Sequence, residues 1–401
     1  MLKWMKVLPL LCLAGISNGA VWGEDLARLL TAPIKIERGA DVTQTLLREE
    51  KGKLFLDASI NGVSREFIFD TGSPTLLSKE LAEELGLEIV GEITGTDAHG
   101  AEVVSRVAVV DTISIADVTF HKVPVLVFDF STLSLAPCLI DGGVLGSEIL
   151  PGSAWRMDLE AGTLRIGNSA KSVGVGKDAL SGKLYDFGYP HAPVTDYKVG
   201  KLKDKAMFDT GSAASVALYE ALLEDKSVMS NLKVLEKGFG SPGESAGGKA
   251  NNERLNRFSL EGLTIGKTAL EEQLSISRTK APTLLGVGLL NAFHITLDYD
   301  KKKFLLEPRA NPEAEKPRND FYLAFKNGVV YVAQLFDETL AHKAGIEVGD
   351  EVLAVDEKNT TFATDEEKCA IADWLADGFD TRLVKAVTVL RNNKEIQLPI
   401  Q

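Results

Sequence analysis

The stretch Phe67-Ile68-Phe69-Asp70-Thr71-Gly72-Ser73 runs from apolar residues directly into a short polar turn. The chain repeats this pattern as Ala206-Met207-Phe208-Asp209-Thr210-Gly211-Ser212. An apolar run that ends in Gly-containing polar residues is typical of a strand followed by a tight turn. One copy alone would more often be an ordinary strand-to-loop corner, because Asp, Thr and Gly are common turn residues. Two copies suggest two carboxylates at the ends of rigid strands, sharing one site.

Further landmarks recur at nearly the same distance along the chain. Asp209 follows Asp70 by 139 positions, and Asp298 follows Asp158 by 140. The apolar pair before Gly146 is matched by an apolar pair before Gly286, again 140 positions later. A constant offset between several landmarks indicates an internal repeat of a whole lobe.

Asp-Thr-Gly-Ser after an apolar strand, followed later in the lobe by two apolar residues and a Gly, resembles the lobes of aspartic proteases. Retroviral-type lobes match better than pepsin-type lobes, because neither predicted flap tip offers a Tyr. The resemblance implies a dyad of Asp70 and Asp209 that acts on a polypeptide substrate without a metal or cofactor. It also implies supporting loop residues and glycines that pack beneath the loops: Thr71, Gly72, Ser73, Thr210, Gly211, Ser212, Gly146 and Gly286.

The dyad chemistry follows from the closeness of two carboxyl groups. Two like charges at hydrogen-bonding distance cannot both ionise, so the pair shares a proton and titrates as a unit. In the family that this chain resembles, the two Thr residues lock the loops together, and the two Ser residues can hydrogen-bond the outer carboxylate oxygens. One ionised and one protonated carboxyl can activate a water and protonate a leaving amine.

Several local patterns predict the elements around the dyad. Asn61-Gly62 predicts a hairpin turn, and Ser78 to Leu87 predicts a short helix capped by Ser78 and stopped by Gly86. Residues 89–110 resemble the flap hairpin of retroviral-type enzymes, with the solvated His99 at its tip; the alternative is an ordinary surface hairpin. Residues 240–248 would be the second flap tip, or else a flexible Gly- and Ser-rich loop.

The last 80 or so residues carry a different pattern. Ala344-Gly345-Ile346, followed by Gly349-Asp350, resembles the core of bacterial PDZ domains. The resemblance implies a small α+β domain that captures a peptide, with its carboxylate-binding loop near residues 321–325, where the usual Gly pattern is absent. Three Pro at positions 308, 312 and 317 suggest a linker with few contacts across it, so that deleting 309–401 should leave the lobes folded.

These patterns together predict a mainly β chain in which two retropepsin-like acid-protease lobes form a pseudo-two-fold bilobed domain, followed by a PDZ-like domain. The predicted segments are a signal peptide at 1–23, a first lobe at 24–168, a second lobe at 183–308, a linker at 309–319 and the PDZ-like domain at 320–401. Residues 24–50 read equally well as a strand, a helix or a pro-segment.

Composition narrows the function classes. A net charge of −13 without Lys/Arg clusters argues against nucleic-acid binding. The five His are not spaced as metal ligands, and the N-terminal apolar run is too short for a membrane span. Because this run reads as a signal peptide, the chain is expected to be exported, to the periplasm or the outside. Nothing in the spacing of Cys138 and Cys369 indicates a disulfide.

Two functions remain open. The first is an aspartic endopeptidase, with the PDZ-like domain capturing a substrate or partner peptide. The alternative is a catalytically silent peptide-binding or scaffold protein with a protease-like fold. In either case the Gly-rich stretch at 167–182 is long enough to let both lobes of one chain pair, which predicts a monomer.

Overall fold

The computed structural model describes residues 24–313, 318–376 and 379–400. The predicted signal peptide and residues 314–317 of the predicted linker lie outside these ranges. The chain divides into two compact units, each described here by itself. Of the described residues, the lobe unit contains 24–130, 140–233 and 259–313, and the C-terminal unit contains 131–139, 234–258, 318–376 and 379–400. No helix in the described ranges is long and apolar enough to cross a membrane.

The first lobe is built mainly from strands, as the sequence predicted. Its elements in chain order are α1 (Glu24–Thr31), β1 (Lys35–Arg38), β2 (Val42–Leu46), β3 (Arg48–Glu50), β4 (Lys53–Ile60), β5 (Val63–Phe69), β6 (Leu76–Ser78), α2 (Lys79–Glu84), β7 (Ile89–Thr96), β8 (Glu102–Ile115), β9 (Val118–Phe128), β10 (Gly143–Leu145), η3 (Ser147–Ile149), β11 (Ala154–Asp158) and β12 (Thr163–Gly167).

Two local predictions in this lobe are confirmed. Asn61 and Gly62 have φ values of 48° and 88°, as the tight turn between β4 and β5 requires. Ser78 caps α2 by accepting a hydrogen bond from the Leu81 N–H at 3.3 Å, and Gly86 follows the helix with a φ of 61°.

The second lobe contains the following elements: β13 (Leu180–Tyr185), β14 (Val194–Val199), β15 (Leu202–Phe208), β16 (Val216–Tyr219), η4 (Glu220–Glu224), α3 (Lys226–Met229), β21 (Leu263–Ile265), β22 (Thr268–Ala269), β23 (Gln273–Arg278), β24 (Thr283–Leu285), η5 (Val287–Asn291), β25 (Phe293–Asp298) and β26 (Lys303–Pro308).

Both lobes use the same strand order around their Asp residues. In the first lobe β5 lies between antiparallel β4 and parallel β10, β10 pairs antiparallel with β6, and β6 runs parallel to β9. In the second lobe β15 lies between antiparallel β14 and parallel β24, β24 pairs antiparallel with β16, and β16 runs parallel to β23. The two Asp residues therefore occupy equivalent positions in the two lobes.

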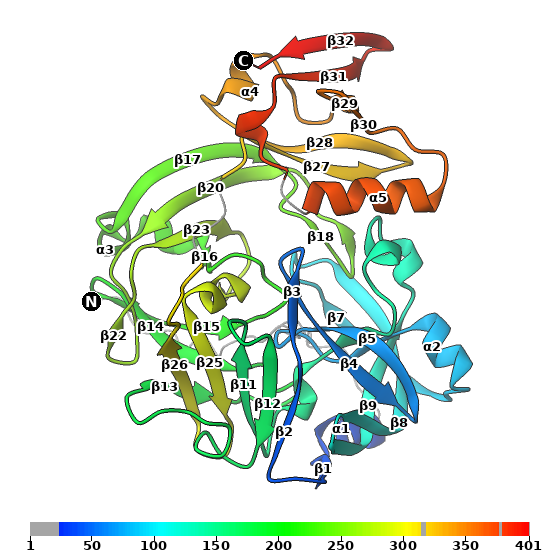
Figure 1. Ribbon diagram of the computed structural model, residues 1–401, viewed down its shortest axis with the longest axis vertical. Coiled ribbons are helices and arrows are strands. Elements are labelled where there is room, and N and C mark those ends of the chain that lie inside the picture. The colour runs from blue at the N-terminus through cyan, green and yellow to red at the C-terminus, as the bar shows by residue number, and fades with distance from the viewer. Residues whose placement is uncertain (1–23, 314–317, 377–378, 401) are drawn as a thin grey trace. The chain divides into compact units, whose positions relative to one another are not determined.

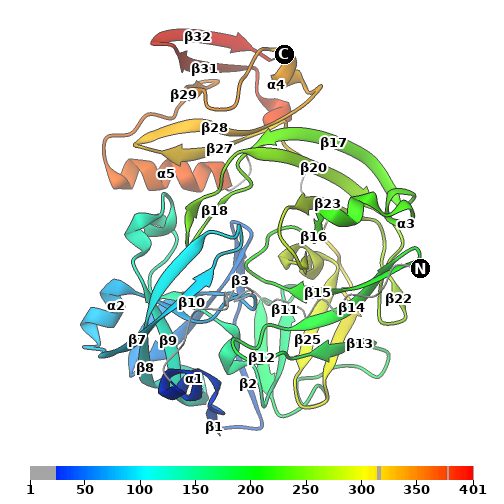
Figure 2. The same ribbon diagram turned by 180° about the vertical axis from the view of Figure 1, so that it is seen from behind.

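One antiparallel sheet joins the lobes. Its strands pair in the order β2, β12, β11, β25, β26 and β13, and they lie side by side in the middle of the lobe unit (Figures 1 and 2). At its centre Trp155 of the first lobe faces Leu297 of the second, and both are fully buried. Backbone hydrogen bonds across β11 and β25 thus fix one lobe against the other.

Residues 24–50 are part of these sheets. β1 pairs with β9, β2 pairs with β12, and Leu30 of α1 is buried against Ile93 and Val107 of the β7–β8 hairpin. A segment that supplies strands to two sheets behaves as a permanent part of the fold, which disfavours the reading of 24–50 as a pro-segment.

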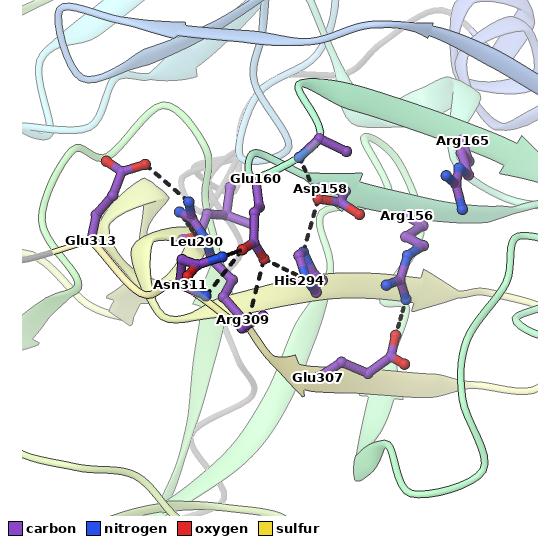
Figure 3. A network of polar contacts seen from close by, with 12 residues as sticks. Arg156, Asp158, Glu160, Arg165, Leu290, His294, Glu307, Arg309, Asn311 and Glu313 are labelled. Atoms are coloured by element: carbon purple, nitrogen blue, oxygen red, sulfur yellow. Dashed lines mark hydrogen bonds and ion pairs between the residues drawn. The ribbon is translucent and has the colours of Figure 1, made fainter.

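Polar contacts fix the chain that leaves the joining sheet (Figure 3). Arg309 donates to the backbone oxygen of Leu290 at 3.1 Å and to Glu313 at 3.0 Å. The Asn311 N–H donates to the Glu160 carboxylate at 3.0 Å, and His294 of β25 lies 3.0 Å from a carboxylate oxygen of Asp158. The first part of the predicted linker is therefore bound to the lobe unit.

The C-terminal unit combines the last part of the chain with two segments from within the lobes. Its elements are η2 (Ala136–Cys138), β17 (Leu232–Gly240), β18 (Glu244–Ser245), β19 (Gly248–Lys249), β20 (Glu253–Leu260), β27 (Phe321–Lys326), β28 (Val329–Phe336), α4 (Leu340–Lys343), β29 (Glu351–Val355), β30 (Lys358–Asn359), α5 (Asp365–Ala376), η6 (Thr381–Leu383), β31 (Ala386–Arg391) and β32 (Lys394–Pro399). β17 and β20 start or end in the lobe unit, at the unit boundaries.

The core of this unit lies between its strands and α5 (Figure 1). Ile371 and Ala372 of α5 pack in one buried cluster with Phe321 and Phe325 of β27. The expected carboxylate-binding loop at 321–325 is instead the strand β27, which pairs with β28 and shifts register between Tyr322 and Leu323. This loop prediction is wrong: residues 321–325 pair with β28 as a strand, and Phe321 and Phe325 anchor that strand in the core.

Two observations overturn the prediction that few contacts cross the linker. Residues 238–240 of β17 pair with β28, with Gly238 opposite Phe336. Cys138 and Cys369 form a disulfide with their Cα atoms 5.2 Å apart, tying the segment after β9 to α5. The predicted second flap tip at 240–248 lies in this unit and includes β18 and the first residue of β19.

Candidate active site

The strands β5 and β15 present the two Asp residues. Phe69 and Phe208, the last residues of these strands, are fully buried and anchor them. The Asp70 N–H donates to the Leu145 backbone oxygen at 2.9 Å, and the Asp209 N–H donates to that of Leu285 at 2.8 Å. Each Asp backbone is thereby fixed by the parallel strand beside it.

Thr71 and Thr210 cross-link the two loops. The Thr71 hydroxyl donates to the Phe208 backbone oxygen at 2.7 Å, and the Thr210 hydroxyl donates to that of Phe69 at 2.7 Å. Each hydroxyl also accepts the other residue's backbone N–H, at 3.0 Å from Thr71 and 3.1 Å from Thr210. Both Thr residues are fully buried, so water does not compete for these four hydrogen bonds.

The carboxyl groups lie against the opposite loop. A Cβ atom added to Gly72 would lie 2.5 Å from the Asp209 Cγ, and one added to Gly211 would lie 2.5 Å from an Asp70 carboxyl oxygen. Each glycine N–H donates to its own loop's Asp, at 2.9 Å from Gly72 to Asp70 and at 2.8 Å from Gly211 to Asp209. Any side chain at either glycine would displace the facing carboxyl group.

Burial and the neighbouring carboxyl together perturb the ionisation of the pair. Burial raises the pKa of Asp209 to about 7, and the charge of Asp70 and a hydrogen bond to it act in the same direction. Lys53 and the Gly211 N–H lower the pKa of Asp209 but do not offset the increase. Asp209 retains some solvent contact, although protein surrounds its carboxyl group. The pair therefore holds a proton near neutral pH.

The two predicted packing glycines take their expected places, whereas the two predicted Ser residues do not both act as expected. Cβ atoms added to Gly146 and Gly286 would lie 2.2 Å from the Pro74 carbonyl carbon and the Ser212 backbone oxygen, so both glycines pack directly beneath the Asp loops. The Ser73 hydroxyl is buried without a hydrogen-bond partner, which contradicts the expected bond to a carboxylate. Ser212 supports its loop through its backbone, donating its N–H to the Asp209 backbone oxygen at 3.0 Å.

One buried carboxyl near the first Asp loop was not predicted. Glu148 of η3 accepts the Thr75 N–H at 3.0 Å and also the Thr75 hydroxyl, and that hydroxyl accepts the Gly146 N–H at 2.9 Å. Burial raises the pKa of Glu148 to about 7. The equivalent position in the second lobe, 140 residues on, is Gly288. The only sign of Glu148 in the sequence is that it stands as a single acidic residue in an otherwise uncharged run.

The β7–β8 hairpin ends in a tip that contacts the second lobe. Arg278 of β23 donates to the Ala98 backbone oxygen at 3.1 Å, and a Cβ added to Gly100 would lie 2.6 Å from the Lys280 side chain. Asp97 organises the tip by accepting the N–H groups of His99 and Ala101. His99, expected to be solvated rather than catalytic, is half-buried here, and burial lowers its pKa.

The sequence match to a known family lies within the first lobe. Residues 56–149 match the sequence model of a family described as aspartyl protease. This match includes Asp70 and Gly146. A search of curated proteins found no match. Among solved structures, the aspartic proteinase from Irpex lacteus is similar with a TM-score of 0.44 and 12% identity, over 68% of this chain and 99% of that chain.

No group of three or more His, Cys, Asp or Glu residues in the part of the chain that the structure describes could hold a metal ion.

Proposed function

We propose that the protein is an aspartic endopeptidase in which Asp70 and Asp209 activate a water molecule for peptide-bond hydrolysis. The observation that carries the proposal is the pair of carboxyl groups held face to face by reciprocal Thr hydrogen bonds, with the pKa of Asp209 raised to about 7. The aspartyl protease match over residues 56–149 supports the same chemistry for the first lobe.

The reaction uses one ionised and one protonated carboxyl. The ionised carboxylate takes a proton from water while the water oxygen attacks the peptide carbonyl carbon, and the protonated carboxyl gives its proton to the carbonyl oxygen. In the second step the C–N bond breaks as the leaving nitrogen gains a proton from one carboxyl of the dyad. A hydroxyl of the gem-diol intermediate gives its proton to the other carboxylate and becomes the carbonyl of the new carboxylic acid. The dyad ends with the same number of protons as it began with.

The proposal also covers where the protein acts and what it binds. In this proposal the protein acts in the periplasm or outside the cell as a monomer, and its PDZ-like part captures a substrate or partner peptide. The disulfide between Cys138 and Cys369 is compatible with an oxidising compartment.

The test is a digest of a mixed peptide library at several pH values by the wild-type protein and by variants of the dyad. The expected result is cleavage that a pepstatin-type transition-state mimic blocks, together with a rise in Tm when the mimic binds. Binding of peptides without any cleavage across the pH range would favour the silent peptide-binding alternative.

A further inference from the structure

Lys53 is a cation from the first lobe that reaches the Asp loop of the second. It is the first residue of β4 and follows a tight turn in which Lys51 and Gly52 have φ values of 55° and 71°. Its ammonium group donates to the Gly211 backbone oxygen, in the middle of the loop that carries Asp209. The side chain is partly buried.

The turn before Lys53 is itself packed against the second loop. A Cβ added to Gly52 would lie 2.9 Å from the Ala213 Cβ, so a side chain at Gly52 would push the turn away. The Gly52 N–H donates to Glu49 at 3.0 Å, which holds the turn in shape. The position of the Lys53 amine is therefore set by the backbone of its hairpin as well as by its own hydrogen bond.

The acidic groups on the same hairpin have other partners. Glu50 pairs with Arg48 at 3.2 Å, and Glu49 accepts from the Gly52 backbone. The charged residues that act on Asp209 are Asp70 and Lys53. The positive charge of Lys53 therefore acts on the dyad.

The equivalent turn of the second lobe has no such cation. His191 has a φ of 73°, close to the 71° of Gly52, and it lies 139 positions later in the chain. The residue that corresponds to Lys53 is Ala192, which is buried. This turn of the second lobe therefore offers the dyad no counterpart of Lys53, although the two Asp loops have equivalent backbones.

We propose that Lys53 is a positioning residue of the dyad, which holds the Asp209 loop through the Gly211 carbonyl and favours the ionised form of the carboxyl pair. This inference rests on the proposed function only for its effect on cleavage. Its effect on ionisation is independent of catalysis. Without the cation, both apparent ionisations of the pair move to higher pH, because a nearby positive charge stabilises a carboxylate.

The test compares Lys53→Met and Lys53→Arg with the wild type. The control is Lys198→Met, which removes the same charge from an exposed position on β14. Carbon-13 NMR of the Asp carboxyl groups, assigned with Asp70→Asn and Asp209→Asn, measures the ionisation directly. We expect Lys53→Met to raise the apparent pKa values of the pair by about one unit. Lys53→Arg and Lys198→Met should leave them near the wild-type values.

The pH profile of kcat/KM gives the second readout. For Lys53→Met it should shift to higher pH by the same amount, and Lys53→Arg should restore the wild-type profile. Unchanged carboxyl titrations in Lys53→Met would overturn the inference. An NMR shift in a protein that cleaves nothing would overturn the proposed function and leave the role of Lys53 standing.

Discussion

At the scale of single residues, Asp70 and Asp209 act as one chemical unit. Each carboxyl lies against the other loop's glycine, so replacing either changes the surroundings of both. We expect Asp70→Asn or Asp209→Asn to lower kcat/KM by roughly a thousandfold or more, and the double variant to lose little beyond that. Measured Tm values should stay near the wild type, because Asn fits the space of Asp. Substantial cleavage by either single variant would contradict a shared dyad.

Glu148 provides a second residue-scale prediction, on stability. Its folded pKa of about 7 lies above its usual value of 4.5, so the folded protein binds the extra proton between these pH values. The contribution of Glu148 to stability is therefore fully present below pH 4.5 and is lost as pH rises to 7. The loss amounts to about 3 kcal/mol.

Glu148→Gln should remove this pH dependence, because the amide does not ionise. The measurement is the free energy of unfolding in denaturant at pH 5 and at pH 8, for the wild type and the variant. Asp209 also has a raised pKa and contributes in the same direction, so both proteins are compared in an Asp209→Asn background. Equal pH slopes with and without Glu148 would show that its burial has no energetic consequence.

At the scale of elements, the β7–β8 hairpin depends on a contact from the second lobe. Arg278 donates to the Ala98 backbone oxygen at the hairpin tip and to the Pro282 backbone oxygen at 2.6 Å. In the flap role that the resemblance to retroviral-type enzymes implies, this hairpin closes over the substrate. Losing one such hydrogen bond should cost about 1 kcal/mol and so lower the population of the closed hairpin roughly fivefold. Arg278→Ala should therefore raise KM about fivefold with a smaller change in kcat.

Hydrogen exchange at the amides of residues 97–101 provides a direct check on this hairpin. Exchange should be faster in Arg278→Ala. Lys280→Ala is the matched control, since it removes a neighbouring cation that contacts Gly100 through its aliphatic carbons. Protection in Arg278→Ala that equals that of the wild type would mean that Arg278 does not hold the tip.

The elements near the Asp residues could be predicted from sequence because their signals are local. An apolar run, a Gly turn and a capping Ser each act over a few residues, and the Asn61-Gly62 turn and α2 formed as expected. The contact of Lys53 with Gly211 could not be predicted in this way, because it joins positions 158 residues apart. Single residues such as Glu148 also carry no periodic signal that marks them as buried.

At the scale of the whole molecule, the C-terminal unit is built from three separate stretches of chain. Deleting everything after residue 313 would leave residues 238–240 of β17 without their strand partner and Cys138 without its disulfide partner. We expect the truncated chain to give less monomeric protein and to melt at a lower temperature than the full chain. The sequence alone had suggested that the lobes would stay folded without residues 309–401.

Calorimetry and size-exclusion chromatography can test this truncation. The double variant Cys138→Ser/Cys369→Ser in the full chain separates loss of the disulfide from loss of the strand partners. A truncated chain that melts like the full-length protein and stays monomeric would show that the lobe unit folds without the C-terminal residues.

The two Asp residues lie in one compact unit of one chain, and backbone pairing between β11 and β25 joins the lobes. Activity per mole should therefore be independent of dilution over at least a hundredfold range of protein concentration, because no second chain is needed to complete the site. The measurement is kcat/KM across that range together with light scattering. Activity that falls with dilution would indicate a site shared between chains.

The separation of Cys138 from Cys369 by 231 residues also has a consequence for protein synthesis. A ribosome adding roughly 5–20 residues per second needs on the order of 10–50 s to travel from the first cysteine to the second. During that interval residues 131–139 and the β17–β20 hairpin exist without the strands and helix that complete their unit. The nascent chain therefore carries an unpaired thiol and an open strand edge until its last part emerges.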